Sequence, residues 1–321
     1  MLENKIICLD GATLYPVADP RWGKFADFGE VQVYDRTAPN EIIERAKDAT
    51  ILLTNKVVID AQTIKRLPKL KCICVLATGY NVVDIEAARA SGIPVCNIPA
   101  YSTASVAQQA IALLLAMTNR VETYSTENRR DRWAKCADFT YRLFETQELD
   151  GKKFGVVGFG NTGRKTAAIA AAFGMKILVY TSKKQEDLPA GYDNVCLDNL
   201  FSESDVVSLH CPLTDSTRNL VNASRLKQMK PTALLINTSR GPVVDEHDLA
   251  TALKEGWIAG AGLDVLSMEP PCNDNELTKL ENCYITPHVA WATVEARERL
   301  FAMTLENIKS FVEGNPCNVV N

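Results

Sequence analysis

Histidine is scarce in this sequence, and long apolar runs and blocks of basic residues are absent from it. The longest uninterrupted apolar run covers residues 110–117, far short of the ~18 residues that a membrane-spanning helix needs. The net charge is −4 without a cluster of lysine or arginine, which argues against nucleic acid as a partner. The N-terminus carries acidic residues and leads directly into an apolar run, so we expect no signal peptide, no membrane partner and a cytoplasmic protein.

Cysteine, in contrast, is abundant, but none of the ten cysteines belongs to a C-x-x-C pair. Cys72 and Cys74 lie two residues apart in an apolar run, which is the spacing of side chains on one face of a strand. Dispersed cysteines in a large chain without a signal peptide are typical of buried, unpaired thiols in a reducing cytosol. We therefore expect no metal site among them.

The sequence is organised around residues 154–164, which read FGVVGFGNTGR. An apolar run leads into Gly158, Gly160 and Gly163, and an alanine-rich segment follows, as in the strand, turn and helix of a dinucleotide-binding motif. Gly158 would permit the tight turn, Gly160 would let the backbone approach a pyrophosphate, and Gly163 would let helix and strand pack closely. An ordinary turn between a strand and a helix remains the alternative, because glycine turns are common.

Strand-like and helix-like segments alternate on both sides of this turn, with five strands before it and six from residue 151 onward. Asn40, Asp60 and Asp84 are each expected to cap a helix. The alternation predicts an α/β protein with two doubly wound parallel sheets, a Rossmann domain inserted in a flavodoxin-like domain. Residues 101–291 would form the dinucleotide-binding domain, and residues 1–100 with 292–321 the substrate domain, because the last helix would cross back to the first.

Two segments fall outside this alternation. Residues 102–120 begin with a Ser or Thr cap and carry apolar residues at helical spacing, which predicts a long helix buried between the domains. Residues 121–150 are polar and charged, with scattered aromatic side chains. Such an arm could pack on a second subunit, which favours a homodimer, or it could pack on its own chain.

Three charged or titratable residues follow apolar strands of the second domain. Arg240 comes after one predicted strand, Glu269 after the next and His288 after the last. Ligands of doubly wound sheets bind at the carboxyl ends of the strands, so these side chains could converge on one crevice. Each also has a plain structural role: a surface ion pair for Arg240, a solvated loop acid for Glu269, and a core histidine for His288.

Several longer segments match one family in order and spacing: VVGFGNTGR, LHCPLTDSTRNLV, LLINTSRGPVVDEHDLATAL, AGLDVLSMEPP and ITPHVAWAT. Over nearly its whole length the sequence resembles the D-isomer-specific 2-hydroxyacid dehydrogenases. The segments SVAQQAIALLLA and HVAWAT are most similar to the glycerate dehydrogenase and hydroxypyruvate reductase branch.

The resemblance implies that Arg240, Glu269 and His288 are the catalytic residues. His288 would donate a proton to the carbonyl oxygen of a 2-keto acid as hydride from a nicotinamide reaches the carbon. Glu269 would orient the imidazole and favour its charged form, and Arg240 would bind the substrate carboxylate with its planar fork. In the family, backbone groups of a first-domain turn also bind this carboxylate, which would place the active site in the cleft between domains. That turn is Ala77, Thr78 and Gly79.

The resemblance also implies the contacts of the cofactor. Backbone groups of the glycine turn would hold the pyrophosphate, the loop after residue 210 would border the adenosine, and the strand ends would border the nicotinamide. The residues carried over are Thr103, Gly158, Gly160, Asn161, Thr162, Gly163, Cys211, Pro212, Thr217, Thr238 and Asp264, with the last accepting from the carboxamide.

One departure from the NAD-dependent pattern concerns the ribose. An acidic residue is expected ~20 residues after the glycines, but the sequence has Thr181, Ser182 and Lys183 there. Hydroxyls and lysines would accept a 2′-phosphate, so we expect NADP in preference to NAD. The lysines would otherwise be surface charges. Trp291 would either limit the pocket to short side chains, as in hydroxypyruvate or glyoxylate, or belong to the core or an interface.

The expected activity is NAD(P)-dependent reduction of hydroxypyruvate or glyoxylate to D-glycerate or glycolate, and the reverse. If the protein is an enzyme, a dehydrogenase of the 3-phosphoglycerate or D-lactate type is the alternative. If the protein is not an enzyme, the alternative is a dinucleotide sensor similar to the C-terminal-binding corepressors. The sequence lacks the extended disordered flanks that a corepressor would use to recruit partners.

Overall fold

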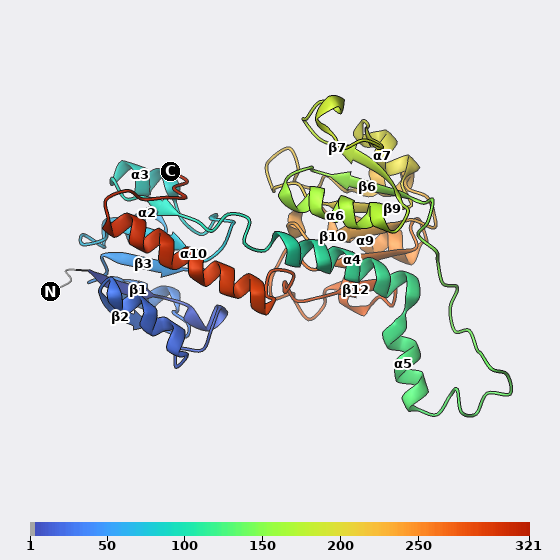
Figure 1. Ribbon diagram of the computed structural model, residues 1–321, viewed down its shortest axis with the longest axis horizontal. Coiled ribbons are helices and arrows are strands. Elements are labelled where there is room, and N and C mark those ends of the chain that lie inside the picture. Colours follow the sequence, from blue (N-terminus) through green and yellow to red (C-terminus); the bar gives the residue numbers. More distant parts are fainter. Residues whose placement is uncertain (1–3) are drawn as a thin grey trace. The chain divides into compact units, whose positions relative to one another are not determined.

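The computed structural model describes residues 4–321 and consists of two compact units. The first unit contains the chain up to Ser102 together with Thr293–Asn321, and the second contains Thr103–Ala292. Both units are parallel α/β sheets covered by helices, which confirms the predicted fold class (Figure 1). No helix within residues 4–321 is long and apolar enough to cross a membrane.

The sheet of the first unit has five parallel strands in the order β2-β1-β3-β4-β5. Its strands are β1 (Lys5–Cys8), β2 (Glu30–Val33), β3 (Ile51–Thr54), β4 (Cys72–Val75) and β5 (Val95–Cys96). Its helices are α1 (Ile42–Ala46), α2 (Ala61–Lys65), α3 (Ile85–Ala90) and α10 (Val294–Val312), with the 3₁₀ turns η1 (Gly11–Thr13), η2 (Pro20–Asp27) and η3 (Pro39–Glu41). This is the flavodoxin-like strand order, whose topological switch point lies between β1 and β3.

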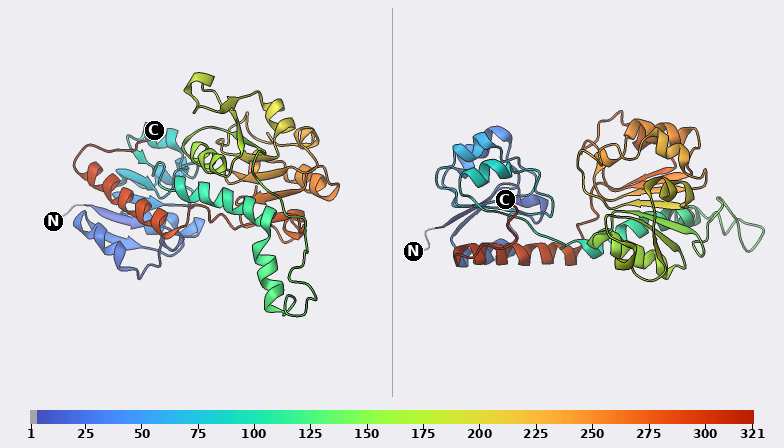
Figure 2. Two further views of the ribbon diagram at one scale, coloured as in Figure 1. Left: turned by 45° about the vertical axis from the view of Figure 1, so that its right-hand side comes forward. Right: turned by 90° about the horizontal axis from the view of Figure 1, so that it is seen from above.

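Helices cover both faces of this sheet. Alternate strand residues such as Leu52 and Ile73 share one apolar cluster with α1, α2 and α3, while α10 lies along the other face (Figure 2, right). Asp60 and Asp84 cap α2 and α3 as predicted, each accepting a backbone N–H with its carboxylate. The prediction for Asn40 is wrong, because this residue lies inside η3, where Pro39 starts the helical turn earlier.

The sheet of the second unit has seven parallel strands in the order β12-β11-β10-β9-β6-β7-β8. They are β6 (Lys153–Val157), β7 (Lys176–Tyr180), β8 (Tyr192–Asn194), β9 (Val206–Leu209), β10 (Leu234–Asn237), β11 (Gly260–Leu263) and β12 (Cys283–Ile285). The order is that of the dinucleotide-binding fold with one strand added at the β12 edge. Sequence reasoning expected six strands and missed β8, whose three residues Tyr-Asp-Asn carry no apolar pattern.

Two helical layers enclose this second sheet. Helices α4 and α6 pack with strand residues such as Phe154 and Ile236 in one cluster, and α7, α8 and α9 pack with Val207 and Leu263 in another. The helices are α4 (Thr103–Asn119), α5 (Val121–Arg129), α6 (Asn161–Ala172), α7 (Leu197–Glu203), α8 (Ala223–Gln228) and α9 (Glu246–Lys254), with the 3₁₀ turns η4 (Gln185–Asp187), η5 (Gly241–Val243) and η6 (Glu276–Lys279).

An arm leaves the second unit after α4. Helix α5 and the irregular segment that follows it stand away from the seven-stranded sheet (Figures 1 and 2). Within the arm, Tyr124 contacts the rings of Tyr141 and Phe144, and the Arg120 guanidinium lies over the Phe144 ring. The arm therefore has a small aromatic core of its own, at a distance from the main core of the unit.

Candidate active site

The three residues predicted to be catalytic follow neighbouring strands of one sheet. In the register of the sheet, Asn237 of β10 lies beside Leu263 of β11, which lies beside Ile285 of β12. Because these strands are parallel, the loops after them emerge at the same edge of the sheet. Backbone hydrogen bonds continue past the strand ends, since the N–H of Asp264 donates to the carbonyl of Asn237 at 2.9 Å. Arg240, Glu269 and His288 all belong to these three loops.

Glu269 and His288 form a direct pair. The distance between His288 Nδ1 and Glu269 Oε2 is 2.6 Å, and Glu269 Oε1 accepts the backbone N–H of Leu266 at 3.0 Å. The His288 side chain is 26% exposed and the Glu269 side chain 35% exposed, so the pair is accessible without being fully solvated. A carboxylate fixed at both oxygens can hold the imidazole in one orientation, which leaves Nε2 as the ring nitrogen for a reacting group.

The loop that carries His288 is held by Asp264, which is 1% exposed. Its carboxylate accepts from Thr286 Oγ1 at 2.6 Å and from the backbone N–H groups of Val289 and Ala290 at 3.0 and 2.9 Å. Burial raises the pKa of Asp264, and these hydrogen bonds oppose that effect. His288 itself adopts a left-handed φ of +51° and donates its N–H to the Asp264 carbonyl at 2.8 Å. The buried carboxylate thus fixes the turn that presents the imidazole, a role that sequence reasoning did not predict for it.

Arg240 sits in a turn that is held by Asn237. The Asn237 side chain donates to the Arg240 carbonyl at 2.9 Å and accepts from the N–H and the hydroxyl of Ser239 at 3.0 and 2.8 Å. Asn237 is 1% exposed, whereas Arg240 is partly accessible and uses Nη1 to donate to the Ser239 carbonyl. Sequence reasoning missed Asn237, although a polar residue that ends the apolar run of β10 is a signal for such a role.

The glycine turn has the geometry that a close phosphate-binding turn requires. Gly158 has a left-handed φ of +94°, and a Cβ there would lie 2.8 Å from the backbone of His210 and Cys211. A Cβ on Gly163 would lie 2.1 Å from the Gly158 carbonyl oxygen. Helix α6 starts at Asn161 with Gly160 as its N-cap, and no side chain caps it. The first N–H groups of this helix are the kind that bind an anionic phosphate.

Substituting Gly163 with alanine should weaken cofactor binding and the fold together. Since the new methyl group would overlap the Gly158 carbonyl, the turn must move, and we expect a dissociation constant for NAD(P)H at least ~10-fold higher and a free energy of unfolding lower by ~1–3 kcal/mol. Fluorescence titration and denaturant unfolding measure these. Gly160→Ala has no neighbour within 4 Å, so it should weaken only cofactor binding, and Gly23→Ala, equally open, should change neither. Wild-type affinity in Gly163→Ala would contradict the close-packing role.

Other predicted cofactor residues occupy the same half of the second unit. Thr238 follows β10, and its Oγ1 is buried without a hydrogen-bond partner among the described residues, which leaves a polar atom for a bound group. Thr217 Oγ1 donates to the Pro212 carbonyl at 2.6 Å and shapes the loop after Cys211. A glycine turn too tight for side chains and an unpartnered buried hydroxyl fit a dinucleotide. The remaining positions are Thr103 at the start of α4, Asn161 and Thr162 at the start of α6, and Thr181, Ser182 and Lys183 after β7.

His210 is a structural residue. It follows β9, and its Nε2 lies 2.9 Å from Ser208 Oγ. Burial lowers the pKa of His210 to about 4, so the imidazole is neutral at physiological pH. A neutral ring that is already hydrogen-bonded inside the protein is a poor proton donor, which leaves His288 as the stronger candidate for acid–base chemistry.

The residues predicted to bind the substrate carboxylate follow β4 in the first unit. Thr78 is fixed by its hydroxyl, which donates to the Ile98 carbonyl at 2.7 Å, and by its carbonyl, which accepts from the Asn97 side chain at 2.8 Å. Ala77 accepts the N–H of Ile98 at 3.0 Å. The turn is therefore well supported within its unit. The sequence predicts that this turn binds the same substrate as His288 and Trp291 of the second unit, and this stays a prediction.

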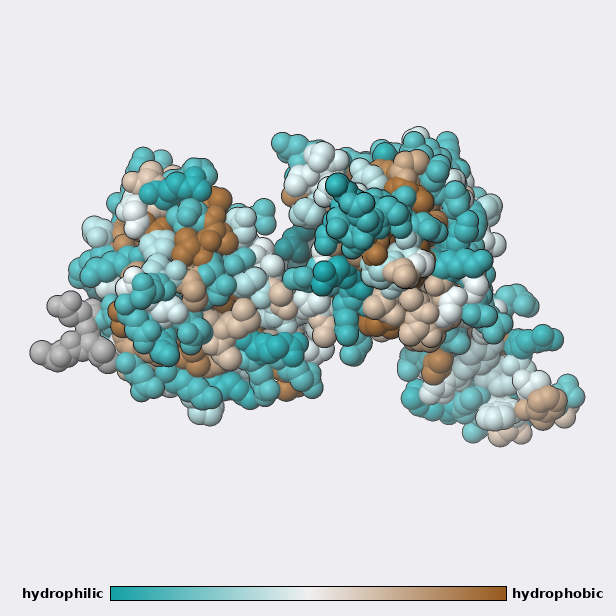
Figure 3. Space-filling view, turned by 45° about the horizontal axis from the view of Figure 1, so that its top comes forward, coloured by the Kyte–Doolittle hydropathy of each residue, from teal (hydrophilic) through white to brown (hydrophobic). Residues whose placement is uncertain are grey.

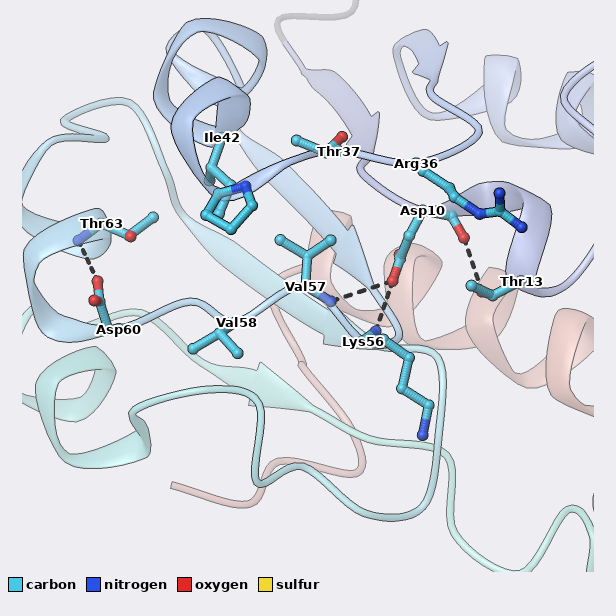
Figure 4. A pocket seen from close by; sticks show the side chains of 11 residues that line it. Asp10, Thr13, Arg36, Thr37, Ile42, Lys56, Val57, Val58, Asp60 and Thr63 are labelled. Carbon is cyan, nitrogen blue, oxygen red and sulfur yellow. Dashed lines mark hydrogen bonds between the residues drawn. The ribbon is translucent and has the colours of Figure 1, made fainter. Parts of the chain in front are cut away.

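A pocket of about 510 Å³ opens in the first unit near the switch point of its sheet (Figure 4). Asp10 lies at its base, 3% exposed, and its carboxylate accepts the backbone N–H groups of Asn55, Lys56 and Val57. Burial raises the pKa of Asp10, against the effect of these hydrogen bonds. Asp10 thus organises the loop after β3, which sequence reasoning did not single out.

Comparison with known proteins identifies the family. Residues 111–290 match the model of the D-isomer specific 2-hydroxyacid dehydrogenase, NAD binding domain. The chain belongs to the D-isomer-specific 2-hydroxyacid dehydrogenases. The matched range contains the glycine turn and Arg240, Glu269 and His288, so the loops described above lie inside the NAD-binding domain of this family.

Two similar dehydrogenases extend over the whole chain. The chain is 44% identical to a hydroxypyruvate reductase of Blautia hydrogenotrophica and 40% identical to a glycerate dehydrogenase of Methylorubrum extorquens, and each match covers 99% of both chains. Among solved structures, an acyclic imino acid reductase in complex with NADPH and D-arginine superposes with a TM-score of 0.87 at 31% identity. That match covers 99% of this dehydrogenase and 100% of the reductase.

Proposed function

We propose that this dehydrogenase reduces a small 2-keto acid, hydroxypyruvate or glyoxylate, to D-glycerate or glycolate, and catalyses the reverse reaction. The single observation that carries the proposal is the 2.6 Å contact between His288 Nδ1 and Glu269 Oε2 in accessible loops at the carboxyl edge of the sheet. The names of the two relatives over the full chain support the choice of substrate.

The residues of this chain divide the chemistry among them. The nicotinamide supplies the hydride when it is bound. His288 donates a proton from Nε2 to the carbonyl oxygen during reduction and removes it during oxidation, while Glu269 holds Nδ1. Arg240 binds the substrate carboxylate and stabilises the charge that develops on the carbonyl oxygen. Asp264 and Asn237 are positioning residues, because they fix the two turns from within the protein.

A turn of the first unit and one aromatic residue complete the proposed substrate pocket. The backbone of the turn from Ala77 to Gly79 would bind the substrate carboxylate together with Arg240. Trp291 is half-buried and follows Ala290 in the loop that Asp264 holds. A ring at this place would restrict the pocket to short side chains, which agrees with hydroxypyruvate and glyoxylate as substrates.

For the cofactor we propose NADP in preference to NAD. Thr181, Ser182 and Lys183 follow β7, which pairs with β6 directly before the glycine turn. The Lys183 ammonium lies 6.0 Å from the centre of the Phe159 ring, within that turn. Among the described residues, the three that directly follow β7 include no carboxylate to accept from a ribose 2′-hydroxyl, and a cation with two hydroxyls suits a 2′-phosphate. The imino acid reductase of the same fold is in complex with NADPH, which supports the proposal of the phosphorylated cofactor.

Replacing Thr181 with aspartate should reverse this preference. A carboxylate at the end of β7 would repel the 2′-phosphate and accept from the 2′-hydroxyl, so we expect the NADPH-to-NADH ratio of kcat/KM to fall by at least ~10-fold. Initial rates with both cofactors measure the ratio. Lys176→Gln, at the opposite end of the same strand and exposed, serves as the control and should leave the ratio unchanged. An unchanged ratio in Thr181→Asp would overturn the phosphate argument.

We also propose that the protein is a cytoplasmic homodimer. On the arm, Phe139 is 90% exposed and Trp133 is 55% exposed, and apolar and polar surface mix over this segment in Figure 3. Large exposed aromatic side chains are typical of interfaces between proteins. The ten cysteines carry no disulfide in the structure, which supports a reducing compartment.

Sedimentation analysis tests the dimer. We expect twice the chain mass for the unsubstituted protein and a shift toward the monomer for Phe139→Ser with Trp133→Ser, because two aromatic contacts would be lost. Val58→Ser, which replaces a 59% exposed side chain outside the arm, is the matched control. A dimer of unchanged stability in the double variant would mean that the arm does not form the interface.

The proposed activity is tested with hydroxypyruvate, glyoxylate, pyruvate and phosphohydroxypyruvate, each with NADH and with NADPH. We expect the highest kcat/KM for hydroxypyruvate or glyoxylate. A maximum for phosphohydroxypyruvate or pyruvate would instead indicate a 3-phosphoglycerate or D-lactate type of dehydrogenase. No oxidation of either cofactor in any mixture would favour a dinucleotide sensor.

A further inference from the structure

Three cysteine side chains meet in the core of the first unit. The Sγ atoms of Cys72, Cys74 and Cys96 all lie within 4.8 Å of one another, and the distance between the first two is 3.9 Å. All three residues are 0% exposed. Cys72 and Cys74 are close in the sequence. Cys96 lies 22 residues after Cys74 and reaches the other two through the pairing of strands.

The sheet register creates this cluster. Cys72 and Cys74 are separated by one residue on β4 and therefore point to the same face. Cys74 lies directly beside Cys96 of β5 in the parallel pairing. The intervening residue Ile73 and its neighbour Val95 belong to the apolar cluster under α1, α2 and α3. The three sulfurs consequently point to the opposite face of the sheet, which α10 covers.

The surroundings of the cluster determine which ligand it could take. Among the described residues no histidine or carboxylate joins the three sulfurs as a further ligand. Hydrogen bonds to Cys72 and Cys96, together with burial, hold the pKa of Cys74 well above its usual range. A divalent or monovalent metal bound by three thiolates would leave a net negative charge in this apolar core, which is strongly unfavourable. Zinc would in addition lack its usual fourth ligand.

We propose that Cys72, Cys74 and Cys96 form a binding site for trivalent arsenic, which enters as neutral arsenous acid. Three S–H bonds and three As–O bonds break and three As–S bonds form. Each hydroxyl leaves as water with the proton of one thiol, so three waters are released. Arsenic remains trivalent, no oxidant or reductant takes part, and the adduct is neutral, as the apolar core requires.

The spacing of the sulfurs suits such a central atom. With a bond of ~2.3 Å to each sulfur, as in zinc thiolates, the three sulfurs around a pyramidal trivalent atom lie about 3.4 Å apart. The Cys72–Cys74 separation of 3.9 Å is close to this value. The longest separation in the cluster is at most 4.8 Å, so an inward movement of less than ~1 Å would complete the site, as rotation about the Cα–Cβ bonds allows.

Access to the buried site has a structural route. Strand β5 has two residues and lies at the edge of the sheet. The C-terminal segment covers this edge, since Val320 donates its N–H to the Val95 carbonyl at 2.9 Å and Asn321 Oδ1 accepts the Val95 N–H at 2.8 Å. Further bonds, from the Asn97 N–H to the Asn318 carbonyl and from the Asn321 side chain to the Ile93 carbonyl, hold the same segment. Local opening of this segment would admit a small neutral molecule to Cys96.

The experiment uses the full reduced chain incubated with sodium arsenite. After gel filtration we expect one arsenic atom per chain by elemental analysis, and three sulfur neighbours by X-ray absorption at the arsenic edge. Cys96→Ala should lose the tightly bound arsenic, with an affinity at least ~100-fold weaker, because one of three covalent bonds is missing. Cys8→Ala removes another buried cysteine, 1% exposed and outside the cluster, and should keep full occupancy.

The pH dependence separates this adduct from a metal–thiolate complex. Because the hydroxyls of arsenous acid take up protons and leave as water, the arsenite affinity should not rise between mildly acidic and mildly basic buffers. Cadmium, used as the comparison ion, would have to displace protons and would bind more tightly as the pH rises. Two sulfur neighbours, full occupancy in Cys96→Ala, or arsenite binding that strengthens steeply with pH would each overturn the proposal. The absorption measurement needs only the unsubstituted protein, so it decides even if a variant fails to fold.

Discussion

Replacing His288 with alanine will lower turnover by ~10²–10⁴-fold and leave the dissociation constant of NAD(P)H within about twofold of its original value. The imidazole is held by Glu269 at 2.6 Å, and this carboxylate is in turn fixed by the N–H of Leu266. Removing the ring deletes the proton donor for the carbonyl oxygen, whereas the glycine turn that would bind the dinucleotide is formed by other residues. Steady-state rates with hydroxypyruvate and glyoxylate, together with fluorescence titration of the cofactor, measure the two effects.

The other histidines provide the controls for this experiment. His247 is exposed at the start of α9, and His247→Ala should retain full turnover. His210 is half-buried and lies against Ser208, and His210→Ala should destabilise the fold through lost packing and an unpaired hydroxyl. If His288→Ala kept a rate near that of the unsubstituted enzyme, the acid–base role would have to move to another residue.

The fold was largely predictable because its signals are local. The apolar run before Gly158 and the helix after Gly160 appear in the structure as β6 and α6. Asp60 and Asp84 cap helices because a side-chain carboxylate can reach the first backbone N–H groups of a helix from one position only. Strand β8 was missed since three residues at a sheet edge need no apolar alternation.

The site was predictable as a set of residues but not as a geometry. The positions of Glu269 and His288 after apolar strands are visible in the sequence, whereas their contact depends on how two loops of a parallel sheet turn toward each other. Asp264 and Asn237 show the same limit. Each ends an apolar strand, yet only the structure reveals that their side chains are occupied by the turns that carry His288 and Arg240.

Long-range register explains what sequence reasoning missed elsewhere. Cys96 is brought to Cys74 by the pairing of β5 with β4, and no spacing rule connects residues on different strands. Asp10 is similar, since its carboxylate accepts a backbone N–H from a loop that lies 45 residues away in the sequence. Pairing between strands is set by the packing of the whole sheet, which single-sequence patterns do not encode.

Replacing Arg240 with lysine will lower kcat/KM for the 2-keto acid by ~10–100-fold, with contributions from both a higher KM and a lower kcat. The guanidinium presents two parallel N–H groups to a carboxylate, and an ammonium retains the charge but not this fork. The turn itself should survive, because Asn237 holds it through the backbone carbonyl of residue 240 and through Ser239. Initial rates over a range of substrate concentrations separate the two kinetic parameters.

Two further variants make this result specific to the fork. Arg89→Lys changes an exposed arginine that pairs with Glu86 on the surface of α3, and it should have no effect on either parameter. Arg240→Ala should lose more activity than the lysine variant and regain part of it when guanidinium ion is added, since the free ion can occupy the vacated place. His288→Ala should gain nothing from the same addition. An unchanged KM in Arg240→Lys, or guanidinium rescue of His288→Ala but not of Arg240→Ala, would remove Arg240 from the substrate site.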